Sequence, residues 1–268
     1  MSGMAACCTV RRVVLAALAA IALIASVAPT GAETVAWYRF EEGVGKEFAK
    51  GIGSVLDTSR HHLNGTPASD HGTPYAHALA PFGDVALALN GRDNWVFVPD
   101  CPRLELAKSL TLEAFVKVRG FNHNGVANFI IFRGDDRPGL DAYWLSLDPR
   151  ACTLNFGVQG SHRDGGVPTA ILKVPFTTLD RTLHVAGVLD DKTGFMGLYI
   201  DGEVVDSMTT SVRACARLHP LYQPGLGIGG FFAGHPPGSF CLDGIIDEVR
   251  ISNVALKPKQ FLYSYEEP

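Results

Sequence analysis

The sequence lacks several features that define large classes of proteins. It shows almost no apolar periodicity near 3.6 residues, which argues against a helical fold. It has no internal repeat, and its 29 glycines and 16 prolines are not concentrated in a linker, so we expect one domain. With 23 basic and 27 acidic residues, it also lacks the basic stripe of a nucleic-acid-binding protein.

Motifs for common catalytic chemistry are missing as well. There is no G-x-S-x-G nucleophile elbow and no H-E-x-x-H metal motif. The glycine-rich stretch 225–230 has no helical pattern after it, so it indicates a strand rather than a phosphate-binding loop. His61, His62, His71 and His77 lie in a polar stretch typical of a loop, and His184 lies in an apolar strand.

Only one long apolar run is present, and it lies at the N-terminus. Val13–Ala28 follows Arg11 and Arg12 and precedes the small residues Pro29–Ala32, which is the pattern of a secretory signal peptide cleaved after Ala32. The alternative is a membrane anchor, but 16 residues fall short of the roughly 20 that a spanning helix needs. We therefore expect export to an extracellular, periplasmic or cell-surface location, no stable membrane span after cleavage, and one domain over 33–268.

Cysteine is scarce beyond this leader. The remaining cysteines are Cys101, Cys152, Cys215 and Cys241. None has the close spacing of a zinc knuckle. An even number in an exported chain favours disulfides, and of the three possible pairings we expect Cys215–Cys241 and Cys101–Cys152, because each would tie neighbouring strands or loops. The alternative is four buried free thiols, since a core of this size needs no covalent link.

The chain does contain a series of short apolar segments with alternating patterns. In Leu110–Val118, apolar residues recur at every second position, which predicts a strand with one face toward a core. Asp201-Gly202 supplies the positive φ angles of a tight hairpin turn. Further strands are predicted at 35–40, 85–89, 95–98, 129–132, 142–147, 154–158, 182–189, 195–200, 203–205, 226–229 and 244–252. This pattern predicts an all-β antiparallel fold with one short helix near Lys257–Tyr263.

Several stretches match, in order and spacing, the motifs of one family. They are Trp37–Gly43, Asp57–Ser59 with Leu63–Thr66, Leu87–Gly91 with Trp95–Pro99, Ser109–Val116, Leu198–Gly202 and Leu242–Ser252. Together they resemble the laminin-G-like jelly-roll family of the concanavalin-A-like lectin/glucanase superfamily. The resemblance implies a two-sheet jelly-roll sandwich, although Phe115 stands where the family usually has Trp. It implies much less about activity, because this sandwich hosts lectins, adhesion modules and some glycosidases.

The resemblance also implies a structural calcium ion, Ca²⁺. It suggests that the loop after the first strand approaches the penultimate strand, bringing Asp57, Asn64 and Asp247 together, with Glu41 nearby. Carboxylate and amide oxygens are suitable ligands for calcium. The alternative is that Asp57 caps a turn, while Asp247 accepts backbone hydrogen bonds or pairs with Arg250.

A glycosidase is the enzymatic alternative on this fold. Retaining enzymes of the superfamily carry E-x-D-x-x-E on one strand, which gives the paired carboxylates that the reaction needs. Here the matching strand offers only Glu113, with Phe115 where the second acid would stand. Asp247 and Glu248 are adjacent, so regular alternation would place them on opposite faces. We therefore expect no catalytic activity, unless an atypical acid pair is assembled from separate loops.

Ligand binding would use aromatic rings and planar polar groups. The candidates are Trp95, Tyr143, Trp144 and Asp136. Adjacent side chains of a strand point to opposite faces, so at most one of Tyr143 and Trp144 lies in the core; core packing is the alternative for every aromatic residue here. The sequence thus predicts an exported, non-catalytic module for carbohydrate or extracellular protein, with a purely structural exported domain as the alternative.

Overall fold

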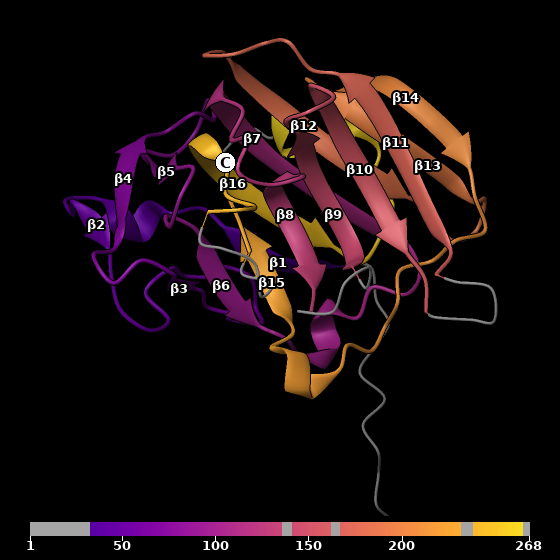
Figure 1. The fold of residues 1–268 in the computed structure, drawn as a ribbon, viewed down its shortest axis with the longest axis horizontal. Helices are drawn as coiled ribbons and strands as arrows, with labels where there is room; N and C mark the ends of the chain where they lie inside the picture. The colour runs from indigo at the N-terminus through magenta and orange to yellow at the C-terminus, as the bar shows by residue number, and fades with distance from the viewer. Residues whose placement is uncertain (1–32, 136–140, 162–166, 232–237, 265–268) are drawn as a thin grey trace, which may run out of the picture. The chain divides into compact units, whose positions relative to one another are not determined.

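The structure is a computed structural model that describes residues 33–135, 141–161, 167–231 and 238–264. These residues form two antiparallel β-sheets packed face to face, and helical structure is limited to short 3₁₀ turns. Figure 1 looks onto the smaller sheet, with the larger one behind it. The predicted all-β sandwich is therefore confirmed. Within the described residues, no helix is long and apolar enough to cross a membrane.

The smaller sheet has seven strands in the order β11-β10-β9-β8-β15-β6-β3. Its strands in chain order are β3 (Thr66–Pro67), β6 (Val96–Pro99), β8 (Asn128–Gly134), β9 (Asp141–Asp148), β10 (Thr153–Gln159), β11 (Thr169–Pro175) and β15 (Gly225–Ile228). We call the side of this sheet that is turned away from the larger sheet its outer face.

The larger sheet has nine strands in the order β14-β13-β12-β7-β16-β5-β4-β2, and β1 pairs with β16 beside this path. Its strands in chain order are β1 (Thr34–Tyr38), β2 (Phe48–Ala49), β4 (Thr73–His77), β5 (Val85–Asn90), β7 (Leu110–Gly120), β12 (Thr182–Leu189), β13 (Phe195–Ile200), β14 (Glu203–Thr209) and β16 (Asp243–Ser252).

The main core lies between the two sheets. Alternate residues of β7 from Leu110 to Val118 are buried in it, as the period-2 pattern predicted. The hairpin between β13 and β14 is also confirmed, because Asp201 and Gly202 have φ angles of 49° and 81° and Ile200 pairs with Glu203. Two consecutive positive φ angles suit the right-handed twist of the flanking strands.

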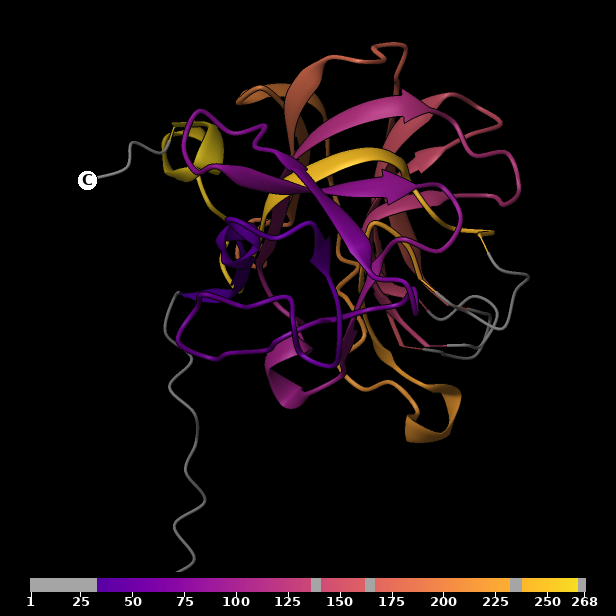
Figure 2. The ribbon, with the colours of Figure 1, turned by 90° about the vertical axis from the view of Figure 1, so that its left-hand side faces the viewer.

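The C-terminal segment departs from the prediction. In place of one helix over Lys257–Tyr263, the chain forms two 3₁₀ turns, η4 (Pro258–Gln260) and η5 (Leu262–Ser264). Figure 2 shows these turns, in yellow, on the side away from β9–β11. Phe261 lies between the two turns and Leu262 begins the second. Both are buried against the outer face of the larger sheet, which is the face turned away from the smaller sheet. The segment bends twice because it follows that face, which a straight helix would leave.

Neither predicted disulfide is present, because all four cysteines are free thiols. Cys215 belongs to the core between the sheets. Cys241 instead lies beside the loop at Arg92, whose carbonyl oxygen is 3.1 Å from its Sγ atom. Cys152 is exposed and Cys101 is half-buried. The two cysteines of each predicted pair thus lie in different environments. Burial raises the pKa of the Cys241 thiol to about 12.

Candidate functional site

Strand β16 changes its neighbour half-way along. Its first residues, 243–246, pair with β5, and residues 249–252 pair with β1. Between them, a bulge interrupts its pairing with β7, and Glu248 adopts a φ angle of 49°. A bulge with a residue in the left-handed region redirects side chains. Asp247 and Glu248 therefore both lie on the outer face of the larger sheet, and the predicted alternation is wrong at this point.

Asp247 is buried, with one of its carboxylate oxygens fully used and the other free. Its Oδ2 accepts hydrogen bonds from the backbone N–H groups of Leu79 and Ala80, at 2.7 and 3.1 Å. Its Oδ1 is buried and has no hydrogen-bond partner among the described residues. Burial raises the pKa of Asp247 to about 6, and the negative charge of Glu41 adds to the shift.

Glu41 lies close to the same bulge. Its Oε1 accepts hydrogen bonds from the backbone N–H groups of Asp84 and Val85, at 2.9 and 3.3 Å. Gly83 has a φ angle of 79°, and a Cβ atom there would lie 2.5 Å from Glu41 Oε1 and 3.6 Å from Glu248 Oε1. The missing side chain at Gly83 lets two carboxylates from distant parts of the chain approach one loop.

Glu248 is buried at the bulge with both oxygens occupied. Its Oε2 accepts a 2.5 Å hydrogen bond from Trp37 Nε1, and its Oε1 accepts one from Arg39 Nε at 3.1 Å. Burial raises its pKa to about 7, partly opposed by Arg39. The roles of Trp37 and Arg39 were not predicted. The sequence offered one indication, because Trp37 and Arg39 are two positions apart at the end of the first strand and so point to the same face.

Asp57 and Asn64 form a separate turn. Asp57 Oδ1 accepts hydrogen bonds from the N–H groups of Trp37 and Ser59, and its Oδ2 accepts bonds from Ser59 Oγ and Leu63 N. Asn64 Oδ1 accepts a bond from Asp57 N at 3.0 Å. The Asp57 carboxylate accepts four hydrogen bonds, so Asp57 caps a turn, as the alternative predicted.

The metal-binding prediction thus divides into two parts. Asp57 and Asn64 do not fit a cation site, because their oxygens serve the turn. Asp247 accepts backbone hydrogen bonds through Oδ2, as the alternative predicted, but its buried Oδ1 has no hydrogen bond among the described residues. The negative charge of Glu41 acts on this carboxylate, so Glu41 and Asp247 are the two residues that fit a cation. No group of three or more His, Cys, Asp or Glu side chains suited to a metal occurs in the described part of the chain. Further ligands would therefore have to be backbone oxygens or water.

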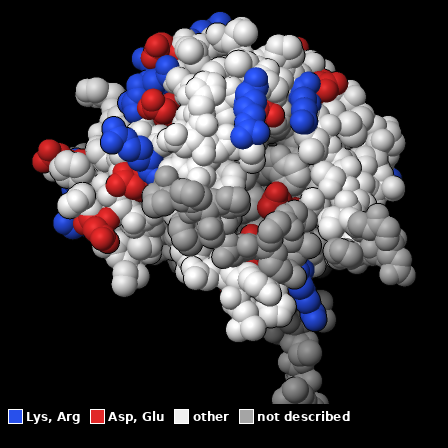
Figure 3. All heavy atoms as spheres, in the orientation of Figure 1, with Lys and Arg blue, Asp and Glu red and all other residues white. Residues whose placement is uncertain are grey.

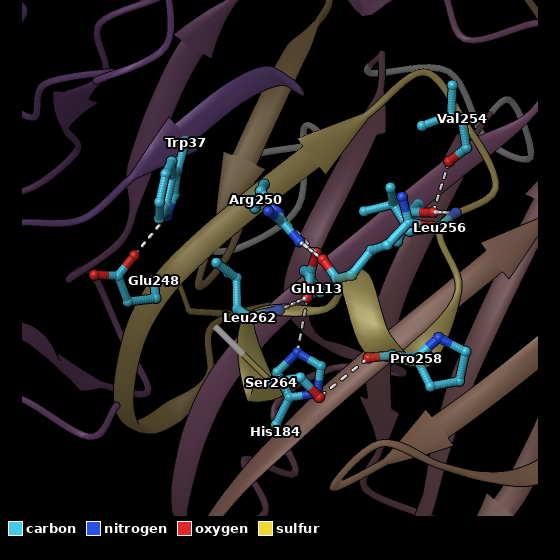
Figure 4. A network of polar contacts seen from close by, with 12 residues as sticks. Trp37, Glu113, His184, Glu248, Arg250, Val254, Leu256, Pro258, Leu262 and Ser264 are labelled. Atoms are coloured by element: carbon cyan, nitrogen blue, oxygen red, sulfur yellow. Dashed lines mark hydrogen bonds and ion pairs between the residues drawn. The ribbon is translucent and has the colours of Figure 1, made fainter. Parts of the chain in front are cut away.

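Glu113 lies at the centre of a second polar network on the same face (Figure 4). Arg250 donates to its Oε1 from Nε and Nη2, at 2.8 and 2.6 Å. Its Oε2 lies 2.9 Å from His184 Nε2 and accepts a 2.8 Å bond from the backbone N–H of Leu262. Glu113 and His184 are fully buried. The carboxylate therefore anchors the C-terminal segment and has no exposed oxygen for a substrate.

The aromatic candidates are divided between the two sides of the smaller sheet. Tyr143 lies in the main core, and its hydroxyl donates to the carbonyl of Leu104 at 3.2 Å. Trp144 lies on the outer face with 8% of its surface exposed. It pairs with Gly157, where a Cβ atom would lie 2.1 Å from the indole, so the ring covers the neighbouring strand. Opposite orientations for the two residues are confirmed.

Trp144 belongs to an aromatic layer on the outer face. The buried members of this layer are Phe129, Phe132, Trp144, Phe231 and Phe240, and Trp95 and Phe97 are partly exposed at its margin. The Trp95 and Phe97 rings are nearly perpendicular, with centroids 6.4 Å apart. Figure 3 shows that most of the described surface on this side is uncharged. Asp136, the last ligand-binding candidate, lies outside the described residues.

Comparisons with known proteins agree on the fold. Residues 90–260 match the family model Laminin_G_3, described as the concanavalin A-like lectin/glucanases superfamily. No curated protein sequence matches the chain.

Several solved structures have a similar fold. One is domain 4 of AbnA, a GH43 extracellular arabinanase from Geobacillus stearothermophilus, in complex with arabinotriose; it is 21% identical, with a TM-score of 0.53, and the match covers 87% of this chain and 98% of that one. Another is the binding domain of Botulinum neurotoxin serotype G, at 9% identity and a TM-score of 0.57. This match covers 87% of this chain but only half of the toxin domain.

A third is the binding domain of Paraclostridial Mosquitocidal Protein 1, which is 14% identical with a TM-score of 0.54; the match covers 81% of this chain and half of that one. Identities this low show a shared fold alone. The family model, in contrast, spans well over half of the sequence, including β7, β16 and every strand between them. The chain therefore belongs to the laminin-G-like family of the concanavalin A-like lectin/glucanases superfamily.

Proposed function

We propose that this protein is an exported, non-catalytic module that binds a glycan at the outer face of the smaller sheet. The observation that carries the proposal is the partly exposed pair Trp95 and Phe97 at the margin of an otherwise buried aromatic layer. Aromatic faces stack on the C–H faces of sugars, and the buried rings behind them hold this pair in place. The arabinanase domain in complex with arabinotriose and the toxin binding domains supply supporting analogies.

The absence of catalysis is proposed from the state of the acidic residues. Glu113 is saturated with hydrogen bonds beneath the C-terminal segment. Asp247 and Glu248 have raised pKa values, which favours an acid–base role. Both, however, are at most 1% exposed, and the two oxygens of Glu248 accept hydrogen bonds from Trp37 and Arg39. A panel of chromogenic glycosides should give no turnover; turnover lost in Glu248→Gln would establish the glycosidase alternative.

Glycan binding is tested with an array of oligosaccharides, followed by titration calorimetry with arabinotriose and any glycan that the array retains. We expect binding in the wild type and about a fivefold loss of affinity in Trp95→Ala, because one stacked ring contributes about 1 kcal/mol. Tyr222→Ala is the matched control, because Tyr222 is an exposed aromatic residue elsewhere on the chain. If the wild type bound no glycan, the proposal would be wrong and the alternative of a purely structural exported domain would remain.

Calcium is the proposed cofactor, held by Glu41 and Asp247. The support is the buried Asp247 Oδ1 without a hydrogen bond, which a cation would stabilise. A bound calcium ion would supply charge neutralisation at the bulge of β16, while the backbone N–H groups of Leu79 and Ala80 orient the carboxylate. Calcium added after chelation should raise the melting temperature of the wild type but not that of Asp247→Asn. Equal midpoints with and without calcium would exclude the ion.

Export is proposed from the first 32 residues. Glu33, the first described residue, donates from its backbone N–H to Asn253 Oδ1 at 2.8 Å, so a new amino terminus there would keep this bond. We expect the mature protein from the periplasm or culture medium to have a mass that begins at Glu33. An intact N-terminus in the membrane fraction would instead indicate an anchor.

A further inference from the structure

A shallow groove lies at the end of the larger sheet, between β4 and the 3₁₀ turn η1 (Glu41–Gly43). Its volume is about 420 Å³, within the roughly 300–1,000 Å³ of small-molecule sites. The side chains that matter here are those of Lys46, Tyr75, His77 and Asp84. None of them was singled out as a ligand-binding residue from the sequence.

One aromatic ring forms the wall of the groove. Tyr75 is half-buried and packs against the main core, which fixes the ring. On its other side, the chain passes so close that a Cβ atom on Gly43 would lie 2.4 Å from Tyr75 Cδ1. Glycine is required at this position because any side chain would displace the ring. The ring is therefore held between the core and the backbone of η1, while part of it lines the groove.

Three polar side chains surround this ring. Tyr75 and His77 alternate along β4 and so point to the same side of the strand. Lys46 and Asp84 approach from the two flanking loops, and both are exposed. No hydrogen bond or ion pair to the side chains of Lys46, His77 or Asp84 is found within the described residues. The charge of Lys46 acts on the nearby Glu42 carboxylate, but the hydrogen-bonding groups of all three side chains are available to a ligand.

Hydrogen bonds fix the backbone that carries Lys46 and Asp84. Lys46 N–H donates to the Gly43 carbonyl at 2.8 Å, and Asp84 N–H donates to Glu41 Oε1 at 2.9 Å. The Asp84 carbonyl accepts a bond from Ala78 N–H at 3.2 Å. Preorganisation of this kind lowers the entropic cost of binding a small polar molecule.

The chemistry of the groove fits a neutral sugar ring. A pyranose or furanose has a C–H face for Tyr75 and hydroxyl groups that both donate and accept hydrogen bonds. Asp84 would accept from hydroxyl groups, and Lys46 would donate to them. An anionic ligand fits less well, because the groove already contains the Asp84 carboxylate and the Glu42 carboxylate lies close by. Burial, and to a smaller extent the charge of Glu42, raises the pKa of Tyr75 to about 12.

We propose that this groove is a second sugar-binding subsite, specific for a neutral sugar; the proposal rests on the proposed glycan-binding function. The groove includes Val85 at the start of β5, whereas Trp95 follows the end of that strand. Six strand residues span about 20 Å. The two surfaces therefore bind separate sugar units, and a short oligosaccharide binds twice per chain.

Calorimetry on the full chain with arabinotriose, and with the neutral glycans that an array retains, tests this subsite. We expect two ligands per wild-type chain and one in Tyr75→Ala, and in the double variant with Trp95→Ala the remaining site should be about fivefold weaker. Asp84→Asn and Lys46→Met change exposed side chains, so we expect both variants to fold, and each should weaken the groove site about tenfold. Tyr75→Phe should keep it within about threefold, because the stacking face remains. Asp70→Asn, an exposed carboxylate outside the groove, is the matched control.

The outcomes separate the two proposals. One ligand per chain, bound more weakly by Trp95→Ala and unchanged in Tyr75→Ala and Asp84→Asn, would overturn the second subsite and leave the glycan-binding function standing. No binding of any glycan to the wild type would overturn both. If Tyr75→Ala does not fold, the comparison of Asp84→Asn with Asp70→Asn decides the matter.

Discussion

At the scale of single residues, the molecule is notable for buried carboxylates on the outer face of its larger sheet. Glu113, Asp247 and Glu248 are almost completely buried, yet among the described residues only Glu113 and Glu248 have cationic partners, in Arg250 and Arg39. Burying a carboxylate without a cation is costly unless it is protonated or binds a metal. Asp247 therefore makes the stability of the metal-free protein sensitive to pH.

The direction of this pH dependence follows from the pKa values. Burial raises that of Asp247 to about 6 and that of Glu248 to about 7, above their ordinary values of about 3.9 and 4.3. Between about pH 4 and pH 7, the folded chain binds more protons than the unfolded chain, so these groups lower stability as pH rises. Urea unfolding in the presence of a chelator should show this fall in the free energy of unfolding. The wild type should lose stability with rising pH relative to the double variant Asp247→Asn/Glu248→Gln. If the difference in the free energy of unfolding between the two proteins stayed constant across that range, the raised pKa values would be contradicted.

Glu113 stabilises the fold, because both oxygens of its carboxylate have hydrogen-bond partners. Glu113→Ala would leave Arg250 without its carboxylate and His184 without its Nε2 partner, in a region closed by Leu262. We expect a loss of about 3–5 kcal/mol in the free energy of unfolding. Chemical denaturation measures it, with Glu203→Ala on an exposed edge strand as the control, expected within about 0.5 kcal/mol of wild type. A loss below 1 kcal/mol would show that the network is not structural.

At the scale of elements, the C-terminal segment covers a sheet face that would otherwise be exposed. Phe261 is 1% exposed and packs edge-on against Tyr199, with ring centroids 5.1 Å apart. Phe261→Ala should cost about 3–5 kcal/mol, as for other buried aromatic residues. Lys259→Ala, on the exposed side of η4, should be neutral. Equal melting temperatures for the two variants would mean that the segment is only loosely attached.

The strands show how far the sequence determines this fold. The boundaries of β12 and β13 were predicted to the residue, because the turn residues 190–194 and Asp201-Gly202 interrupt the apolar sequence. β11 was missed although Ala170, Leu172 and Val174 alternate within it, because Pro168 and Pro175 at its ends obscured the pattern. β2 and β3 have two residues each, too few for any periodic signal.

The candidate site was less accessible to prediction than the strands. Glu41 and Asp247 were identified, but Glu248 was placed on the wrong face, because no local pattern reveals its left-handed backbone. Its partner Trp37 is 211 positions away in sequence, and this contact depends on the exchange of β5 for β1 along β16. The groove at Tyr75 depends on the close approach of Gly43, which is likewise a long-range contact.

At the scale of the whole molecule, the sandwich is held together without disulfides in its described residues. A chain of this length buries enough apolar surface for a stable fold, and the core here runs across both sheets. Excess dithiothreitol should therefore leave the melting temperature unchanged. Titration of the unfolded, exported chain should find four thiols, and in the native protein Cys152 should react first, because it is exposed while Cys215 and Cys241 are buried. Fewer than four thiols, together with a lower melting temperature after reduction, would restore the disulfide prediction.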